Sequence, residues 1–208
     1  MKKLLISLAV VLWLPITAIA AEYSPGNGYA LIKDPVRTAN PDKIEVLEIF
    51  WYGCPHCFRL EPLTQAWKKN IPADVDFSFM PAVFGRSWDA HARAYYVSEL
   101  LGITEKTHVA IFDGIHVEKR RLNSKDTLAK FFEQYGVSKA TFEKQYNSFA
   151  VNSRLTQADA KIRAYGVQGV PALIVNGKYM VSAQTAGGNA NIYPVINFLI
   201  EKERQAKK

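Results

Sequence analysis

Cysteine is scarce in this sequence, which contains only Cys54 and Cys57. A small exported protein that relies on disulfides for stability usually carries several pairs of cysteines. A disulfide between Cys54 and Cys57 would close so short a loop that it adds little stability through loop entropy. An ordinary stabilising disulfide is therefore the weaker alternative, and the sequence indicates that the value of the pair lies in its reactivity.

Long apolar runs are absent after the first twenty residues, so no later segment is predicted to cross a membrane. The chain begins with Lys2 and Lys3, continues through an apolar stretch from residue 4 to about 16, and reaches Ala18 and Ala20. This pattern predicts a secretory signal peptide over residues 1–20, cleaved after about Ala20. A membrane anchor is the alternative, but the run is shorter than the ~20 residues that span a bilayer. We therefore expect an exported protein that works in an oxidising compartment.

A strong charge imbalance is also lacking. The net charge is +7, and removal of the two lysines in residues 1–20 lowers it to +5. The most basic stretch, residues 119–125, has no aromatic side chains between its charges that could stack on bases. The sequence therefore predicts no nucleic-acid partner.

Histidine is too sparse for a convincing metal site. A zinc site built on Cys54 and Cys57 needs two further ligands, and the chain has four histidines. His56 lies inside the cysteine motif, while His91, His108 and His116 fall on predicted helices without a recognisable pairing. We predict no metal and no cofactor, and interpret these three histidines as ordinary surface or hydrogen-bonded core residues.

Hydrophobic periodicity and stop signals predict an α/β protein. Internal repeats, low-complexity tracts and flexible linkers are absent, which favours one domain over residues 21–208. The order of elements is that of a thioredoxin-like fold with an inserted helical domain at about residues 87–150. The predicted elements are an irregular lead-in over 21–43 with at most one short edge strand near 29–32, a buried strand over 43–52, a helix from 55 toward 70, a strand over 75–80, helices between about 87 and 165, a strand over 171–175, its hairpin partner over 178–181, and a last amphipathic helix.

The cysteine motif lies at a predicted helix start. Pro55 suits the first helical position, which places Cys54 at the N-cap and Cys57 inside the first turn. At the N-cap, unpaired backbone N–H groups and the positive end of the helix dipole favour a thiolate. His56 can add a positive charge or an N–H donor near the same sulfur. We therefore predict a lowered pKa for Cys54 as the nucleophile, with the less exposed Cys57 as the resolving thiol.

The stabilised thiolate also sets the direction of the chemistry. A thiolate of low pKa is a good leaving group, so a disulfide between Cys54 and Cys57 is readily broken by an incoming thiol. The reduced pair is then favoured, and the sequence predicts a protein that oxidises other thiols.

Two motifs together resemble those of the DsbA family of bacterial periplasmic thiol oxidases. The first is Phe-Trp-Tyr-Gly-Cys-Pro-His-Cys over residues 50–57; the second is Gly-Val-Pro over 169–171 followed by Val-Asn-Gly-Lys-Tyr over 175–179. The resemblance covers nearly the whole chain after the signal peptide. It implies that the protein introduces disulfide bonds into exported proteins in the periplasm through the redox-active disulfide Cys54–Cys57.

The resemblance also implies roles for further residues and partners. Pro171 is expected to be cis and to lie against the active-site sulfurs, which leaves the backbone of Val170 free to pair with an extended substrate. Glu48 is expected to be a buried acid that assists proton movement, whereas Glu45 could be the exposed end of the same strand. An apolar groove beside Cys54 is expected to bind unfolded or partly folded exported proteins with free thiols. A DsbB-type, quinone-linked inner-membrane protein is the expected reoxidant, and we expect a monomer.

Two other function classes fit parts of the sequence. A periplasmic disulfide isomerase or chaperone would resemble this frame, but it adds an N-terminal dimerisation domain for which residues 21–43 are too short. A non-catalytic peptide-binding module, in which the cysteines no longer react, is the third class.

Overall fold

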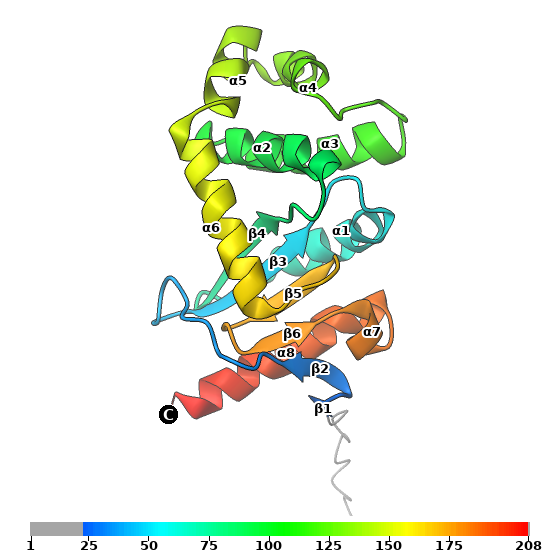
Figure 1. Ribbon diagram of the computed structural model, residues 1–208. Coiled ribbons are helices and arrows are strands. Elements are labelled where there is room, and N and C mark those ends of the chain that lie inside the picture. The colour runs from blue at the N-terminus through cyan, green and yellow to red at the C-terminus, as the bar shows by residue number, and fades with distance from the viewer. Residues whose placement is uncertain (1–22, 208) are drawn as a thin grey trace, which may run out of the picture.

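A computed structural model describes residues 23–207, so the predicted signal peptide lies outside the described residues. A six-stranded mixed sheet with the strand order β1-β2-β6-β5-β3-β4 forms the centre (Figure 1). Strand β3 runs parallel to β4 and antiparallel to β5, and β6 is antiparallel to both β5 and β2. The strands are β1 (Ser24–Pro25), β2 (Gly28–Leu31), β3 (Ile44–Phe50), β4 (Val75–Pro81), β5 (Ala172–Val175) and β6 (Tyr179–Val181).

Helices cover the sheet and extend beyond one end of it (Figure 1). Between β4 and β5 the chain forms α2 to α6, and the predicted helical insertion at about residues 87–150 falls within this run. The exact bounds of that insertion stay a prediction. Within residues 23–207, no helix combines the length and apolar character needed to span a membrane. The helices are α1 (Pro55–Lys68), α2 (Arg86–Leu100), α3 (Thr104–His116), α4 (Lys125–Phe132), the 3-10 turn η1 (Glu133–Tyr135), α5 (Lys139–Tyr146), α6 (Phe149–Tyr165), α7 (Ala183–Ala186) and α8 (Asn189–Ala206).

Strand β3 is buried on both faces, as its richness in apolar and aromatic residues predicts, although it also contains Glu45 and Glu48. Side chains alternate along a strand, so Ile44 and Val46 pack with α1 and α8, while Leu47 and Ile49 pack with α6. The same alternation turns Glu48 toward α1 and α8. Glu45 faces the other side and is buried, which corrects the expectation that it could be an exposed strand end.

The helical region has a core of its own that includes the two cysteines. Its local boundaries follow the sequence signals closely. Ser124 and Ser138 cap α4 and α5 with side-chain hydrogen bonds to Thr127 N and Thr141 N, and Gly166 ends α6 in the left-handed conformation. Capping chemistry of this kind depends on residues only a few positions apart, so these boundaries follow from the local sequence.

The lead-in contains more structure than the sequence indicates. The predicted edge strand is present as β2, but the two-residue strand β1 pairs with it in addition, so the expectation of at most one strand is wrong. Strand β2 joins β6, which makes the lead-in part of the central sheet instead of a separate domain.

The hairpin between β5 and β6 turns at Asn176 and Gly177, where the sequence places it. Both residues have positive φ, 49° and 64°, as a two-residue hairpin of this kind requires. A Cβ on Gly177 would lie 1.9 Å from the carbonyl oxygen of Val36, whose N–H donates to the Gly177 oxygen at 3.0 Å. Only glycine therefore fits between this turn and the lead-in.

Gly177→Ala should lower the free energy of unfolding by about 2–3 kcal/mol, because a backbone clash adds to the strained φ. Gly102→Ala is the matched control: Gly102 has a similar φ of 67° but no atom within reach of a Cβ. It should cost only about 1 kcal/mol. Urea denaturation of the two variants checks this, and equal losses would contradict a steric role for Val36.

Candidate active site

Cys54 occupies the N-cap of α1, and Pro55 begins the helix. The residues before the helix form a tight turn in which the Cys54 N–H donates to the Trp51 oxygen at 2.9 Å. Phe58 N–H donates to the Cys54 oxygen at 3.0 Å, which closes the first helical turn. Both cysteines are free thiols; Cys54 is 7% exposed and Cys57 is fully buried. Attack from solvent is thus directed at Cys54.

The two thiols have opposite electrostatic surroundings. Hydrogen bonds to the Cys54 sulfur, first from the Cys57 thiol and then from the backbone N–H groups of Cys57 and His56, lower the pKa of Cys54 to about 6 despite its partial burial. Burial is the main reason why the pKa of Cys57 is raised far above that of a free thiol. At neutral pH the dithiol therefore carries its negative charge on Cys54.

His56 contributes less than the sequence suggests. Its ring is exposed, and the positive charge of His56 lowers the pKa of Cys54 less than the hydrogen bonds from Cys57 and the His56 backbone do. Arg59 lies 2.8 Å from Nδ1 of His56. A guanidinium group can only donate, so Nδ1 accepts and the ring proton of the neutral form lies on Nε2.

His56→Ser should raise the pKa of Cys54 by less than about one unit, since the hydrogen bonds from Cys57 remain. The redox potential should become less oxidising in proportion, because about 30 mV in a two-electron couple equals about one pKa unit. Thiolate absorbance against pH and equilibration with glutathione measure the two quantities. A shift of several pKa units would show that the ring dominates after all.

The Pro171 loop lies against Cys54. The Val170–Pro171 peptide bond is cis, as the family resemblance implied, and the Cys54 thiol lies 3.5 Å from the Val170 carbonyl oxygen. A groove of about 400 Å³ runs beside this loop. Its lining includes His56, Gly169, Val170, Pro171, Met180 and Gln184. The loop and the groove bring a protein surface next to the reactive sulfur.

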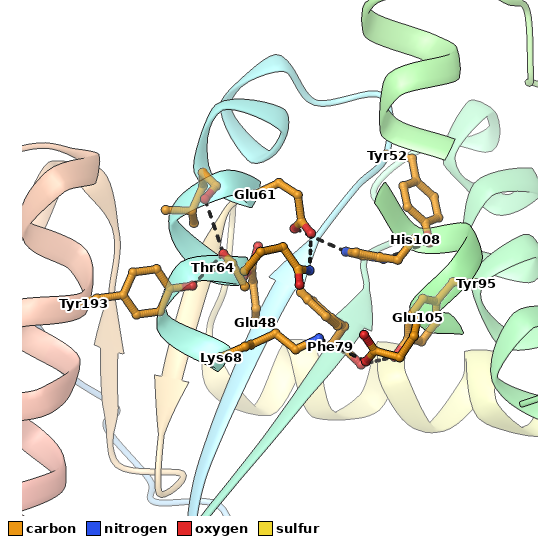
Figure 2. A network of polar contacts seen from close by, with 12 residues as sticks. Glu48, Tyr52, Glu61, Thr64, Lys68, Phe79, Tyr95, Glu105, His108 and Tyr193 are labelled. Carbon is orange, nitrogen blue, oxygen red and sulfur yellow. Dashed lines mark hydrogen bonds and ion pairs between the residues drawn. The ribbon is translucent and has the colours of Figure 1, made fainter. Parts of the chain in front are cut away.

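Glu48 lies behind the cysteines and is 1% exposed. Its carboxylate accepts a hydrogen bond from Thr64 Oγ1 at 3.0 Å, and the Tyr193 hydroxyl donates to Thr64 Oγ1 at 2.6 Å (Figure 2). Burial, followed by the negative charge of Glu61, raises the pKa of Glu48 to about 8. Glu48 can therefore hold a proton at neutral pH, and its charge acts on Cys57.

Sequence reasoning missed Glu61, a second carboxyl group buried near Glu48. A signal was present: the buried positions of α1 include Cys57, Leu60, Glu61 and Thr64, the spacing of one helical face. Cys57 and Leu60 already marked that face, so Glu61 could have been placed on it.

A stack of two indoles supports the active-site turn. The rings of Trp51 and Trp88 lie parallel with centroids 4.1 Å apart. A Cβ at Gly53 would approach the Trp51 ring to 2.3 Å, so glycine is needed for the turn and the stack to coexist. Trp88 comes from α2, and the helical region thereby helps to fix the cysteine turn.

The other predicted histidines have distinct partners. His91 Nε2 is 2.8 Å from the Leu122 oxygen, and His116 Nε2 is 2.8 Å from the Tyr52 oxygen, as expected of hydrogen-bonded core residues. His108 instead contacts Glu61 and Tyr52, a pairing that the sequence did not reveal. Among residues 23–207, no group of three His, Cys, Asp or Glu side chains is arranged to hold a metal ion.

Comparison with known families gives a match over most of the chain. The family described as DSBA-like thioredoxin domain matches residues 45–191. The chain is 41% identical over 191 residues to the thiol:disulfide interchange protein DsbA of Pseudomonas aeruginosa, covering 92% of this chain and 90% of that protein. It is 41% identical over 187 residues to the protein of the same name from Azotobacter vinelandii, covering 90% and 87%.

Solved structures agree with the sequence relatives. The crystal structure of Pseudomonas aeruginosa DsbA superposes with a TM-score of 0.84 at 41% identity, covering 89% of this chain and 97% of that one. The oxidoreductase DsbA from Xylella fastidiosa gives a TM-score of 0.82 at 35% identity, covering 88% and 98%.

Proposed function

This chain belongs to the DSBA-like thioredoxin family, and we propose that it works as a dithiol oxidase with Cys54 as its reactive sulfur and Cys57 as its resolving sulfur. The protein introduces disulfide bonds into other proteins by thiol–disulfide exchange. The observation that carries the assignment of the two sulfurs is their opposite environment: the pKa of Cys54 is lowered to about 6, while burial raises the pKa of Cys57.

The reaction starts from the Cys54–Cys57 disulfide. A substrate thiolate attacks the Cys54 sulfur, which forms a mixed disulfide and releases Cys57 as a thiolate that must take up a proton. A second thiol of the same substrate, as its thiolate, attacks the substrate sulfur of the mixed disulfide. The substrate then leaves with a new disulfide bond, and Cys54 departs as a stabilised thiolate. The low pKa of Cys54 makes this last step favourable and makes the protein an oxidant.

The surrounding residues have separate roles in this reaction. Pro55 starts the helix whose N–H groups stabilise the Cys54 thiolate, and His56 adds one of those N–H groups together with a small electrostatic effect. Val170 and Pro171 present a backbone edge beside Cys54 on which an extended substrate can lie. Glu48 supplies the proton that the Cys57 thiolate needs, because its carboxyl group is protonated at neutral pH.

The partners follow from this chemistry. The substrates are unfolded or partly folded exported proteins with free thiols, which reach the protein in the periplasm after its signal peptide has been cleaved after about Ala20. Each turnover leaves two thiols on the enzyme, so a membrane reoxidant of the DsbB type must regenerate the disulfide. The protein acts as a monomer, without a metal or cofactor of its own.

The equilibrium redox potential of the pair against glutathione tests this function. We expect a potential far more oxidising than that of thioredoxin, because stabilisation of the Cys54 thiolate favours the reduced protein. A potential close to that of thioredoxin would overturn the assignment as an oxidase. Size-exclusion chromatography with light scattering tests the monomer.

A further inference from the structure

Behind Cys57 lies a pair of buried carboxyl groups, Glu48 and Glu61 (Figure 2). Glu48 accepts a hydrogen bond from Thr64, whereas Glu61 faces His108 on α3. Glu61 is 3% exposed and lies on α1 one turn beyond Cys57. Its Oε2 atom is 3.4 Å from Nε2 of His108, and its Oε1 atom accepts a hydrogen bond from Gln65 at 2.5 Å. His108, also 3% exposed, comes from α3 in the helical region.

The tautomer of His108 follows from its second contact. The hydroxyl of Tyr52 lies 3.0 Å from Nδ1 of His108. Burial raises the pKa of Tyr52 well above its ordinary value, so the hydroxyl keeps its proton and can donate it to Nδ1. A neutral ring that accepts at Nδ1 carries its own proton on Nε2, which points at Glu61. Neither Nε2 of His108 nor Oε2 of Glu61 has a hydrogen-bond partner among the described residues, so the link from His108 to Glu61 is a polar contact at 3.4 Å.

The charged groups near Glu61 do not replace His108 as the contact of the Glu61 Oε2 atom. Lys68 on α1 acts on Glu48, but its ammonium group is paired with Glu105 on α3 at 3.1 Å. The aromatic rings packed against His108 include Phe50, Phe79 and Phe112, which offer no polar atom. The titratable groups that contact or act on the carboxyl pair are His108 from α3, Tyr193 from α8, Tyr52 from the turn after β3, and Cys57 and Lys68 from α1. Glu105 from α3 pairs with Lys68, and Tyr95 from α2 acts on Tyr52.

We propose that His108 is a positioning residue for the thiol chemistry: its ring, 3.4 Å from Oε2, fixes the Glu61 carboxyl group beside Glu48, so that Glu48 keeps the proton that it exchanges with Cys57. This inference rests on the proton role proposed above for Glu48. It gives the helical region a direct part in the chemistry, because His108 on α3 lies within 3.4 Å of Oε2 of Glu61. Without His108 the Glu61 carboxylate is no longer held in place, and its negative charge raises the pKa of Glu48 less than before.

The step that this affects is the attack of Cys57 on a mixed disulfide. In that step the bond between Cys54 and a small thiol such as glutathione breaks, and the Cys54–Cys57 bond forms. The proton of Cys57 passes to the Glu48 carboxylate, and glutathione leaves as a thiolate that is protonated by water. The step needs Glu48 in its ionised form, so its rate rises with pH as the pair gives up its proton.

The experiment measures the rate at which the Cys54–glutathione mixed disulfide resolves as a function of pH. His108→Phe keeps an aromatic ring in an aromatic cluster but removes the polar contact to Glu61, and it should move the midpoint of the profile to lower pH by about one unit. His108→Gln keeps an N–H donor without a titrating ring and should retain the original midpoint. His91→Phe is the matched control, because His91 is a buried histidine of the neighbouring helix whose nitrogen faces the Leu122 oxygen instead of a carboxylate.

Two further variants separate the possible outcomes. In a Glu61→Gln background, His108→Phe should no longer move the midpoint, since no carboxylate remains whose charge could act on Glu48. A shift that persists in this background, or no shift in His108→Phe alone, overturns the role of His108. Glu48→Gln should flatten the profile; if it leaves the profile unchanged, the proton role of Glu48 fails and the inference with it, whereas the assignments of Cys54 and Cys57 stand.

Infrared spectroscopy of the reduced protein locates the proton even if His108→Phe does not fold. At neutral pH the carbonyl band of a buried, protonated carboxyl group should be present in the original protein and in Glu61→Gln, and absent in Glu48→Gln. A band that disappears in Glu61→Gln and remains in Glu48→Gln places the proton on the other carboxyl group and overturns the proposal.

Discussion

Cys54→Ser should abolish both the oxidase activity and the thiolate absorbance of the reduced protein. The pKa of Cys54 is lowered to about 6, whereas burial holds the pKa of Cys57 far above neutrality, so Cys54 is the source of the thiolate signal near neutral pH. In the unaltered reduced protein the absorbance should therefore fall as the pH drops through about 6. Ultraviolet titration of the reduced forms measures this directly.

Cys57→Ser is the matched variant. It removes the thiol that makes the largest contribution to lowering the pKa of Cys54, so the thiolate should persist but titrate at a higher pH than before. With oxidised glutathione, the variant should also accumulate a stable Cys54–glutathione mixed disulfide, because the Cys54 thiolate displaces one glutathione thiolate and no resolving thiol remains. If the thiolate signal survives in Cys54→Ser and vanishes in Cys57→Ser, the roles of the two sulfurs are reversed.

Glu48→Gln should make the protein more stable at alkaline pH while changing its stability little at acidic pH. The pKa of Glu48 is raised from 4.5 to about 8 by folding, mainly through burial. The folded protein therefore binds a proton that the unfolded chain releases between these values, and its stability falls as the pH rises from about 4.5 through about 8. The full loss is on the order of 5 kcal/mol, and a glutamine at this position should remove it.

Thermal or urea denaturation of the reduced protein across this pH range checks the prediction. Asp126→Asn is the control, since Asp126 is an exposed carboxylate in an ion pair with Lys139 and its removal changes the net charge equally. The stability difference between Glu48→Gln and the unaltered protein should grow with pH, and that of the control should not. A constant difference at every pH would show that Glu48 does not hold a proton on folding.

The parts of the site that the sequence predicted depend on residues close together in the chain. The N-cap position of Cys54 follows from Pro55 beside it, and the burial of Glu48 follows from its place among the apolar residues of a buried strand. Those signals need no knowledge of the tertiary structure. The weak effect of His56 could not be foreseen, because it depends on how the Cys57 thiol and the backbone N–H groups point at one sulfur.

The missed contacts join segments that are far apart in the sequence. Glu61 contacts His108 because α3 of the helical region packs against α1, and this packing cannot be predicted from the sequence pattern. The stack of Trp51 on Trp88 has the same origin. Strand β1 was not predicted for another reason: a strand of two residues is too short to show a periodic pattern.

The pairing of β3 with β5 has a consequence for how the chain acquires its activity as it is made. Val46 pairs with Val175, so the centre of the sheet closes only when nearly the whole chain is present. Such long-range contacts make folding slow, whereas the neighbouring unit of β3, α1 and β4 is local and can form early. The cysteines belong to this early unit, but the Val170 carbonyl beside Cys54 arrives with the last quarter of the chain. A nascent chain therefore carries its two thiols, and no others with which they could pair wrongly, well before it has the surface that would present them to a substrate.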